Sequence, residues 1–88
     1  MKVTKRNGNL VIYDDEKVAN SIVWANGRTS NEVITISRAE AIADEVFRRL
    51  TAEKDIITTA EIRDCVYKVL KEQGYPDTAE NYINYKAN

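Results

Sequence analysis

Two adjacent cations stand directly before an Asn-Gly pair near the start of the chain. Lys5 and Arg6 precede Asn7 and Gly8 in the stretch VTKRNGNLVIYDDEK, residues 3–17. Asn-Gly readily adopts the positive φ angles of a two-residue type I′ turn, so the stretch predicts a β-hairpin. A hairpin end would hold both cations rigidly, as a binding site for an anion requires. Taken alone, the pair is more typical of charges that keep a hairpin soluble.

A second feature that could bind an anion is the start of a helix at residues 58 and 59. Thr58 and Glu61 have the spacing of a capping box, which fixes a helix N-terminus, and Thr59 follows the cap. Most threonine pairs of this kind serve only as caps. The N-terminus of a helix nevertheless presents unpaired N–H groups and the positive end of the helix dipole, and both favour phosphate.

These features would act together if the chain brought them to one place. Ile56 and Ile57 predict a short third strand directly before the helix. If that strand lies beside the hairpin, Lys5 and Arg6 converge on the helix start, and Lys86 in the last helix completes a cationic cradle. Such a cradle suits a triphosphate, and apolar hairpin residues could hold a base.

The residue types that the sequence lacks exclude several kinds of site. The chain has no histidine, three glycines and one cysteine, Cys65. Without histidine the commonest general base is missing, and one cysteine forms neither an internal disulfide nor a structural zinc site. Three separated glycines do not supply a P-loop or a dinucleotide-binding fingerprint. Cys65 lies on an apolar helix stripe, so we expect a small core residue and no catalysis.

Length and charge indicate one small domain, residues 1–88, with no general attraction to polyanions. The 88 residues suffice for one modest core, and 13 basic against 14 acidic residues give a net charge of −1. This balance argues against attraction of nucleic acid or anionic lipid by the overall field. No apolar stretch is long enough to cross a membrane, and MKVTKRNG lacks the apolar core of a secretory signal. We therefore expect a cytoplasmic location.

A two-residue turn would fix the register of the predicted hairpin. The pairs that it predicts are Arg6–Asn9, Lys5–Leu10, Thr4–Val11 and Val3–Ile12. Both faces of the hairpin are then partly apolar, so we expect one face to be covered and the other to be occupied.

Four amphipathic segments follow the hairpin and predict four helices. The first helix is predicted to start at Asp14 or Asp15 and to end with a C′ stop at Gly27. The second starts at the Ser37–Glu40 capping box, the third runs from Thr58 to Gly74, and the fourth starts at Asp77 with Glu80. Residues 28–36 are predicted to be a loop without functional signal. The order of elements predicts an α+β fold, in which a β-hairpin or three-stranded sheet caps a four-helix bundle.

Two motifs near the ends of the chain together resemble a known family. The first is VTKRNG followed by VIYDDEKV and SI, and the second is TTAEIRDCVYKVL followed by DTAENYINYK. This pattern is similar to ATP-cone domains, the allosteric nucleotide-binding modules at the N-terminus of many ribonucleotide reductases and in a bacterial repressor of reductase genes. The resemblance covers residues 3–86 and rests on both ends of the chain rather than on the middle loop.

The resemblance implies a domain that binds ATP or dATP, with Mg²⁺, as a regulatory ligand. It implies phosphate contacts for Lys5 and Arg6, a place beside the phosphates for Thr59, and nucleotide contacts for Arg63 and Lys86. The full set of nucleotide-binding positions that it implies is Val3, Lys5, Arg6, Asn7, Gly8, Thr59, Arg63 and Lys86.

Two positions depart from the pattern of the family. Asn7 stands where most members have aspartate, although asparagine keeps the turn. Val11 lies near the position where some members carry an acidic residue that distinguishes the sugar. The resemblance therefore leaves the choice between ATP and dATP open.

Three functions stay open on this sequence. The first is a nucleotide-sensing regulatory module without an active site, either free-standing or joined to a reductase. Its partner would be a reductase catalytic domain or subunit, or a second copy of the chain when nucleotide binds. SRAEAIADEVFRRL and DTAENYINYKAN are most similar to anaerobic-type reductases. The second is the module of the repressor, but that protein carries four zinc-binding cysteines upstream, so one cysteine argues against direct nucleic-acid binding. The third is a nucleotide-independent protein–protein interaction module.

Overall fold

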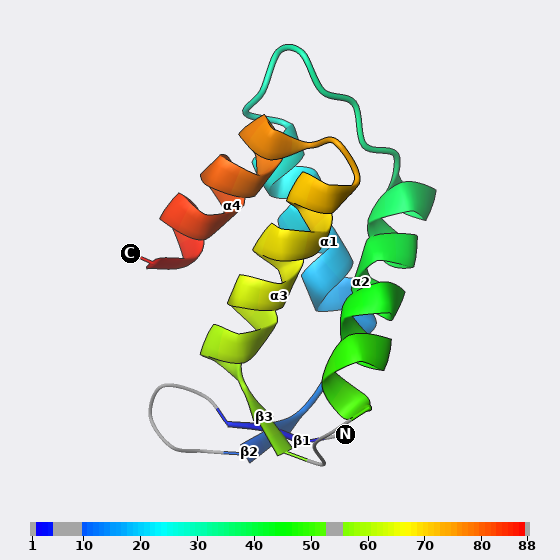
Figure 1. Cartoon of the computed structure of the whole chain (residues 1–88), viewed down its shortest axis with the longest axis vertical. Helices are drawn as coiled ribbons and strands as arrows, with labels where there is room; N and C mark the ends of the chain where they lie inside the picture. Colours follow the sequence, from blue (N-terminus) through cyan, green and yellow to red (C-terminus); the bar gives the residue numbers. More distant parts are fainter. Residues whose placement is uncertain (1, 5–9, 53–55, 88) are drawn as a thin grey trace.

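The computed structural model describes residues 2–4, 10–52 and 56–87, and most of these are helical. In chain order the elements are β1 (Lys2–Thr4), β2 (Leu10–Ile12), α1 (Asp15–Asn26), α2 (Ile36–Thr51), β3 (Ile56–Thr58), α3 (Thr59–Glu72) and α4 (Pro76–Ala87). Figure 1 shows the strands at one end of the molecule and the loop between α1 and α2 at the other. The predicted α+β architecture is confirmed in part. All four predicted helices are present, but the sheet is small and the described structure is mostly helical. In the described part of the chain, no helix is long and apolar enough to span a bilayer.

The sheet has the strand order β2–β1–β3, with β1 in the middle. β1 pairs antiparallel with β2, as Lys2–Ile12, Val3–Val11 and Thr4–Leu10, and parallel with β3. The predicted hairpin register is therefore wrong by one residue, since Val11 was expected opposite Thr4. An odd number of residues, 5–9, separates Thr4 from Leu10, and a two-residue turn between directly opposed positions leaves an even number. Residues 5–9 themselves lie outside the described part of the chain.

Side-chain caps set the starts of α1 and α2. Asp14, and not Asp15, caps α1, because its carboxylate accepts hydrogen bonds from two backbone N–H groups of the first turn, at 3.0 and 3.3 Å. Thr35 caps α2, because its hydroxyl accepts from the backbone N–H three residues later, at 3.1 Å. The predicted capping box of Ser37 and Glu40 is therefore wrong. The helix begins earlier and gains a backbone hydrogen bond to the Thr35 carbonyl, at 2.9 Å.

Gly27 and Gly74 follow α1 and α3 but adopt different backbone conformations. Gly27 follows α1 at the predicted stop, but its φ of −62° is ordinary right-handed geometry, so it is the C-cap and does not adopt the left-handed conformation common at C′. Gly74 has a φ of +89°. Its N–H donates to the Lys71 carbonyl at 3.2 Å, and the Tyr75 N–H donates to the Leu70 carbonyl at 2.9 Å. This pair of bonds is a Schellman motif, and it turns the chain from α3 into α4.

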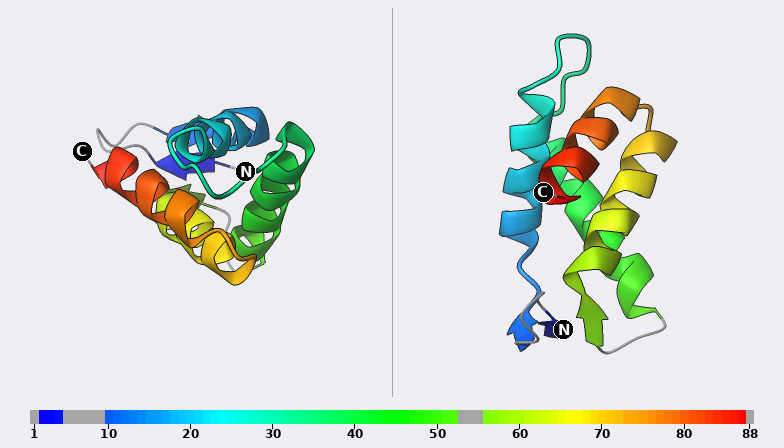
Figure 2. Two further views of the ribbon diagram at one scale, coloured as in Figure 1. Left: turned by 90° about the horizontal axis from the view of Figure 1, so that it is seen from above. Right: turned by 90° about the vertical axis from the view of Figure 1, so that its left-hand side faces the viewer.

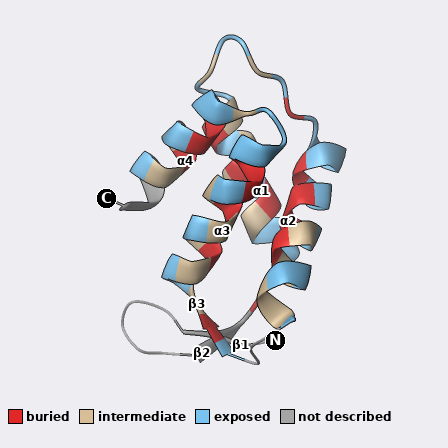
Figure 3. Cartoon of the chain, viewed as in Figure 1, coloured by how far each residue is buried: buried red, intermediate tan, exposed pale blue. Residues whose placement is uncertain are grey.

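The apolar stripes of the four helices meet in one core. Each helix packs against two neighbours, in the ring α1–α2–α3–α4, and the view along the bundle in Figure 2 shows this arrangement. Figure 3 shows the buried positions on the inner faces of the helices. The buried apolar side chains are Tyr13, Ala19, Ile22, Ala25, Ile34, Ala39, Ile42, Ala43, Val46, Ile57, Ile62, Val66, Val69, Leu70, Ala79 and Tyr82. Cys65 is half-buried against this core, and burial raises the pKa of its thiol, which disfavours the reactive thiolate.

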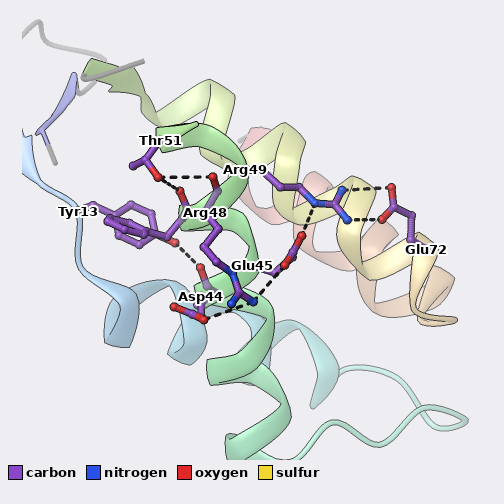
Figure 4. Close-up of polar contacts among 9 residues, drawn as sticks. Tyr13, Asp44, Glu45, Arg48, Arg49, Thr51 and Glu72 are labelled. Carbon is purple, nitrogen blue, oxygen red and sulfur yellow. Dashed lines mark hydrogen bonds and ion pairs between the residues drawn. The ribbon is translucent and has the colours of Figure 1, made fainter. Parts of the chain in front are cut away.

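Polar contacts tie α2 to the segments beside it (Figure 4). The Tyr13 hydroxyl donates to the Ala43 carbonyl at 3.0 Å, and burial raises the pKa of this phenol far above its ordinary value. Arg49 donates to Glu45 at 2.8 Å and reaches across to Glu72 at 2.6 and 3.2 Å. The Arg49 pairs are solvent-accessible and therefore add little to stability, so the α2–α3 contact depends mainly on the core.

Candidate nucleotide-binding site

The sheet brings the start of α3 beside the first strand. β1 and β3 run parallel, and Thr4, the last residue of β1, pairs with Thr58, the last residue of β3. Both strands therefore end at the same edge of the sheet. In the sequence Thr4 is followed by Lys5, and Thr58 is followed by Thr59 at the start of α3. The predicted condition for a shared site, a third strand that lies beside the first, is confirmed.

The start of α3 is fixed by the capping box that the sequence predicts. The Thr58 hydroxyl accepts a hydrogen bond from the Glu61 N–H at 3.0 Å, and the Glu61 carboxylate accepts one from the Thr58 N–H at 3.0 Å. Thr59 is the first residue of the helix and is exposed. The first N–H groups of a helix point out of its N-terminus, where the helix dipole favours an anion. The geometry therefore offers Thr59 and the first turn of α3 to an anionic ligand.

Arg63 lies one turn after Thr59 on α3, the helix that packs against α4. Its Nε donates to the Asp64 carboxylate at 3.1 Å, and its side chain is 28% exposed. Burial raises the pKa of Tyr82 on α4, and the positive charge of Arg63 partly offsets this rise. Arg63 therefore acts electrostatically on α4 and remains accessible to solvent on α3.

The described structure contains only part of the predicted nucleotide-binding set. Val3 lies in β1, beside Val11 of β2 and Ile57 of β3, and Lys86 lies in the last turn of α4. α4 runs back from the loop end in the direction of the sheet (Figures 1 and 2). Lys5, Arg6, Asn7 and Gly8 lie outside the described residues, so their contacts remain predictions. Among the described residues, no group of three or more acidic or cysteine side chains could hold a metal ion.

Sequence reasoning missed Glu32, in the loop predicted to carry no functional signal. The Glu32 carboxylate accepts hydrogen bonds from the N–H groups of Asp77 and Thr78 at 2.9 and 2.8 Å, so it caps α4 from a distant segment. α4 begins at Pro76, so the predicted opening at Asp77 with Glu80 is wrong, because Asp77 already lies inside the helix. Proline is well suited to the first helical position. The residue before it is Tyr75, which has no side chain suited to an N-cap. This missing local cap was the available signal that another segment supplies one.

Comparison with known proteins identifies the family of the chain. The family model described as the ATP cone domain matches residues 1–88, the whole chain. A search of curated proteins finds no individual match. ATP-cone domains are regulatory rather than catalytic, and they bind ATP or dATP as allosteric ligands. The chain belongs to the ATP-cone domain family.

Proposed function

We propose that this domain binds ATP or dATP between the end of β1 and the start of α3. The observation that carries the proposal is the parallel pairing of Thr4 with Thr58. Because both strands end at one edge of the sheet, the chain segment that contains Lys5 and Arg6 begins next to the start of α3. Two cations and a helix N-terminus are the groups that a triphosphate requires.

The proposed contacts divide the ligand between several elements. Lys5 and Arg6 neutralise the phosphates, Thr59 binds at the helix start, and Arg63 and Lys86 approach from α3 and α4. Each charge-assisted hydrogen bond to phosphate is worth roughly 1.5–3 kcal/mol, so the loss of one contact is measurable. Val3, Asn7 and Gly8 shape the strand and turn. Mg²⁺ arrives with the nucleotide, because this ion prefers phosphate oxygens and water as ligands.

We propose further that nucleotide binding controls a ribonucleotide reductase of the anaerobic type. The support is the family match together with the similarity of SRAEAIADEVFRRL and DTAENYINYKAN to such reductases. The partner is then a reductase catalytic domain or subunit in the cytoplasm. A nucleotide that joins the hairpin, α3 and α4 orders the surface beside Tyr85 and Lys86 in the last part of α4, so association with a second copy depends on the ligand.

A nucleotide-independent interaction module is the second candidate. The observation that favours it is the Glu61 carboxylate, which already occupies the first turn of α3 and repels a second anion there. In this reading the positive end of the helix dipole is satisfied from within the chain, and the fold serves only to present a surface to another protein.

Calorimetric titration with ATP and dATP, each with Mg²⁺, distinguishes the two candidates. We expect saturable binding of at least one nucleotide and a higher Tm, since a ligand at 100 times its Kd stabilises the folded state by about 2.7 kcal/mol. Sedimentation measured in the same solutions reports nucleotide-dependent association. No heat and no change in Tm at millimolar nucleotide would overturn the proposal and leave the interaction module.

A further inference from the structure

Three side chains join the loop between α1 and α2 to the first turn of α4. The Glu32 carboxylate accepts hydrogen bonds from the Thr78 hydroxyl at 2.7 Å and from two N–H groups of α4 at 2.8 and 2.9 Å. The Asn26 amide donates to the Glu32 carbonyl at 2.9 Å and to the Thr78 hydroxyl at 3.2 Å, and its oxygen accepts from the Ile34 N–H at 3.0 Å. We call Asn26, Glu32 and Thr78 the loop–helix cluster.

The loop–helix cluster is built to hold one arrangement. Thr78 is fully buried, so its hydroxyl has no access to water if Glu32 moves away. Desolvation alone raises the pKa of Glu32, but the hydrogen bonds from Asp77 and Thr78 outweigh it and lower the pKa. The charged carboxylate is therefore the form that fits the N-terminus of α4. As a result, the loop and the first turn of α4 are fixed to each other.

The remainder of α4 connects this cluster to the proposed nucleotide site. The Tyr67 hydroxyl of α3 donates to Glu80 at 2.9 Å, and Arg63 of α3 acts on Tyr82 one half-turn later. Lys86 lies in the last turn of the same helix. A helix of 12 residues is about 18 Å long and moves as a rigid element. A displacement of α4 at its last turns is therefore carried to its first turn.

We infer that Glu32 is a positioning residue through which nucleotide binding at the sheet end is transmitted to the loop at the opposite end of the molecule. This inference rests on the proposed nucleotide site, because it requires that the ligand contact α4. The surface that responds is the loop together with an open polar pocket beside α4, which is bordered by Arg28, Asn31, Asp77 and Glu80. Asn31 donates to Asp77 at 3.1 Å, so this contact also makes the loop follow α4 when the helix moves.

The chain contains a natural reporter of this response. Trp24 is the single tryptophan, lies near the end of α1 and is 40% exposed. The guanidinium of Arg28, in the loop, is 4.3 Å from the centre of its ring. A movement of the loop alters this contact and with it the fluorescence of Trp24, even though the ligand binds at the other end.

The experiment titrates ATP with Mg²⁺ and reads Trp24 fluorescence, excited at the red edge of the indole absorption where adenine does not absorb. Calorimetry on the same samples gives the Kd independently. For the parent we expect a fluorescence change with the calorimetric Kd. For Glu32→Gln, which keeps the size but removes the charge, we expect ATP to bind with most of the fluorescence change lost. Glu40→Gln, an exposed residue of α2, is the matched control and should respond like the parent.

The possible outcomes distinguish a failure of the inference from a failure of the proposed function. ATP binding without a Trp24 response in the parent overturns the inference and leaves the nucleotide site intact, whereas no calorimetric binding overturns both. A parent-like response in folded Glu32→Gln also overturns the inference. If circular dichroism shows that Glu32→Gln does not fold, Glu32→Asp keeps the charge on a shorter side chain and should reduce the response. Thr78→Ser keeps the hydroxyl and should preserve it.

Discussion

The N-termini of α3 and α4 have the same requirement and meet it in different ways. At the sheet end, α3 is capped by Thr58 and Glu61, three residues apart in the sequence. At the loop end, α4 is capped by Glu32, which lies 46 residues before Thr78. The local capping box leaves Thr59 exposed beside the ends of β1 and β3, whereas the carboxylate of Glu32 fills the anion site of α4 from within the chain.

The difference separates the proposed site for an external anion from a site occupied by an internal one. A helix N-terminus attracts negative charge wherever it occurs. At α4 a side chain of the same chain supplies that charge and a buried hydroxyl fixes it, so the contact serves stability and the placement of α4. At α3 the neighbouring strand leads into two cations, so the sheet end is the one suited to phosphate.

The largest expected effect is the loss of the distant cap. Glu32→Ala leaves the buried Thr78 hydroxyl and two N–H groups without their acceptor, and an unsatisfied buried group costs roughly 1–3 kcal/mol. We expect the free energy of unfolding in urea to fall by about 2–3 kcal/mol, with a Tm lower by roughly 10–20 °C. Glu40→Ala on exposed α2 is the control. A loss equal to that of the control would show that Glu32 is dispensable.

Next in size is the effect of the paired cations on affinity. Lys5→Ala and Arg6→Ala each remove a charge-assisted phosphate contact, so we expect the Kd for ATP to rise roughly 10- to 150-fold in calorimetry. Stability should change by less than about 1 kcal/mol. Lys68→Ala and Arg38→Ala, at exposed positions of α3 and α2, are the charge-matched controls. Unchanged affinity in both variants would show that the ligand does not bind at this edge of the sheet.

A smaller pair of effects distinguishes the cap of α3 from its ligand contact. Thr58→Ala removes the capping hydroxyl and should lower the free energy of unfolding by about 1 kcal/mol. Its ATP affinity should be unchanged when it is measured under conditions in which the variant is fully folded. Thr59→Ala should weaken ATP binding with little change in Tm, because Thr59 is exposed and takes no part in the capping box. The reverse pattern would place the ligand contact on Thr58.

The smallest effect is the pH dependence that comes from Glu32. The folded-state pKa of Glu32 lies below its ordinary value of 4.5, so its contribution to stability is fully present above that value and is lost as pH falls through the folded-state pKa. Asp77, which also carries a carboxyl group, lies beside Glu32 in both proteins, so the difference between the parent and Glu32→Gln isolates the contribution of Glu32. We expect this difference in urea-unfolding free energy to shrink on acidification below 4.5. A difference that is constant with pH would mean that Glu32 makes no charge-dependent contact.

The comparison also explains how much of the structure could be predicted. The capping box of Thr58 and Glu61, the third strand and the four helices depend on residues close in sequence, so local patterns were sufficient. The predicted hairpin register was wrong because the prediction assumed a two-residue turn at Asn7 and Gly8. The observed pairing is shifted by one residue, so an odd number of residues connects the two strands. The start of α2 was misplaced because Thr35 and Ser37 are both suitable caps.

The contact that could not be predicted is the one between Glu32 and α4. It is made by a carboxylate in an irregular loop and by backbone groups 45 and 46 residues later, and no periodicity relates such positions. The sequence contained only an indirect sign, the tyrosine that precedes Pro76 without a capping group. At the proposed nucleotide site, by contrast, the predicted residues belong to two local motifs, and the predicted convergence depends on the pairing of β3 with β1, which the structure shows.

Paramagnetic broadening of backbone amide signals by Mn²⁺-ATP tests the central claim most directly, because the broadening falls steeply with distance from the phosphates. The domain is titrated with Mn²⁺-ATP, with Mg²⁺-ATP as the diamagnetic reference and Mn²⁺ alone as the control for ions bound by carboxylates. The account predicts that the amides of Thr4, Thr58, Thr59 and Arg63 broaden first, while those of residues 28–35 stay sharp. Broadening centred on Asp77 and Thr78, with the sheet end unaffected, would contradict it.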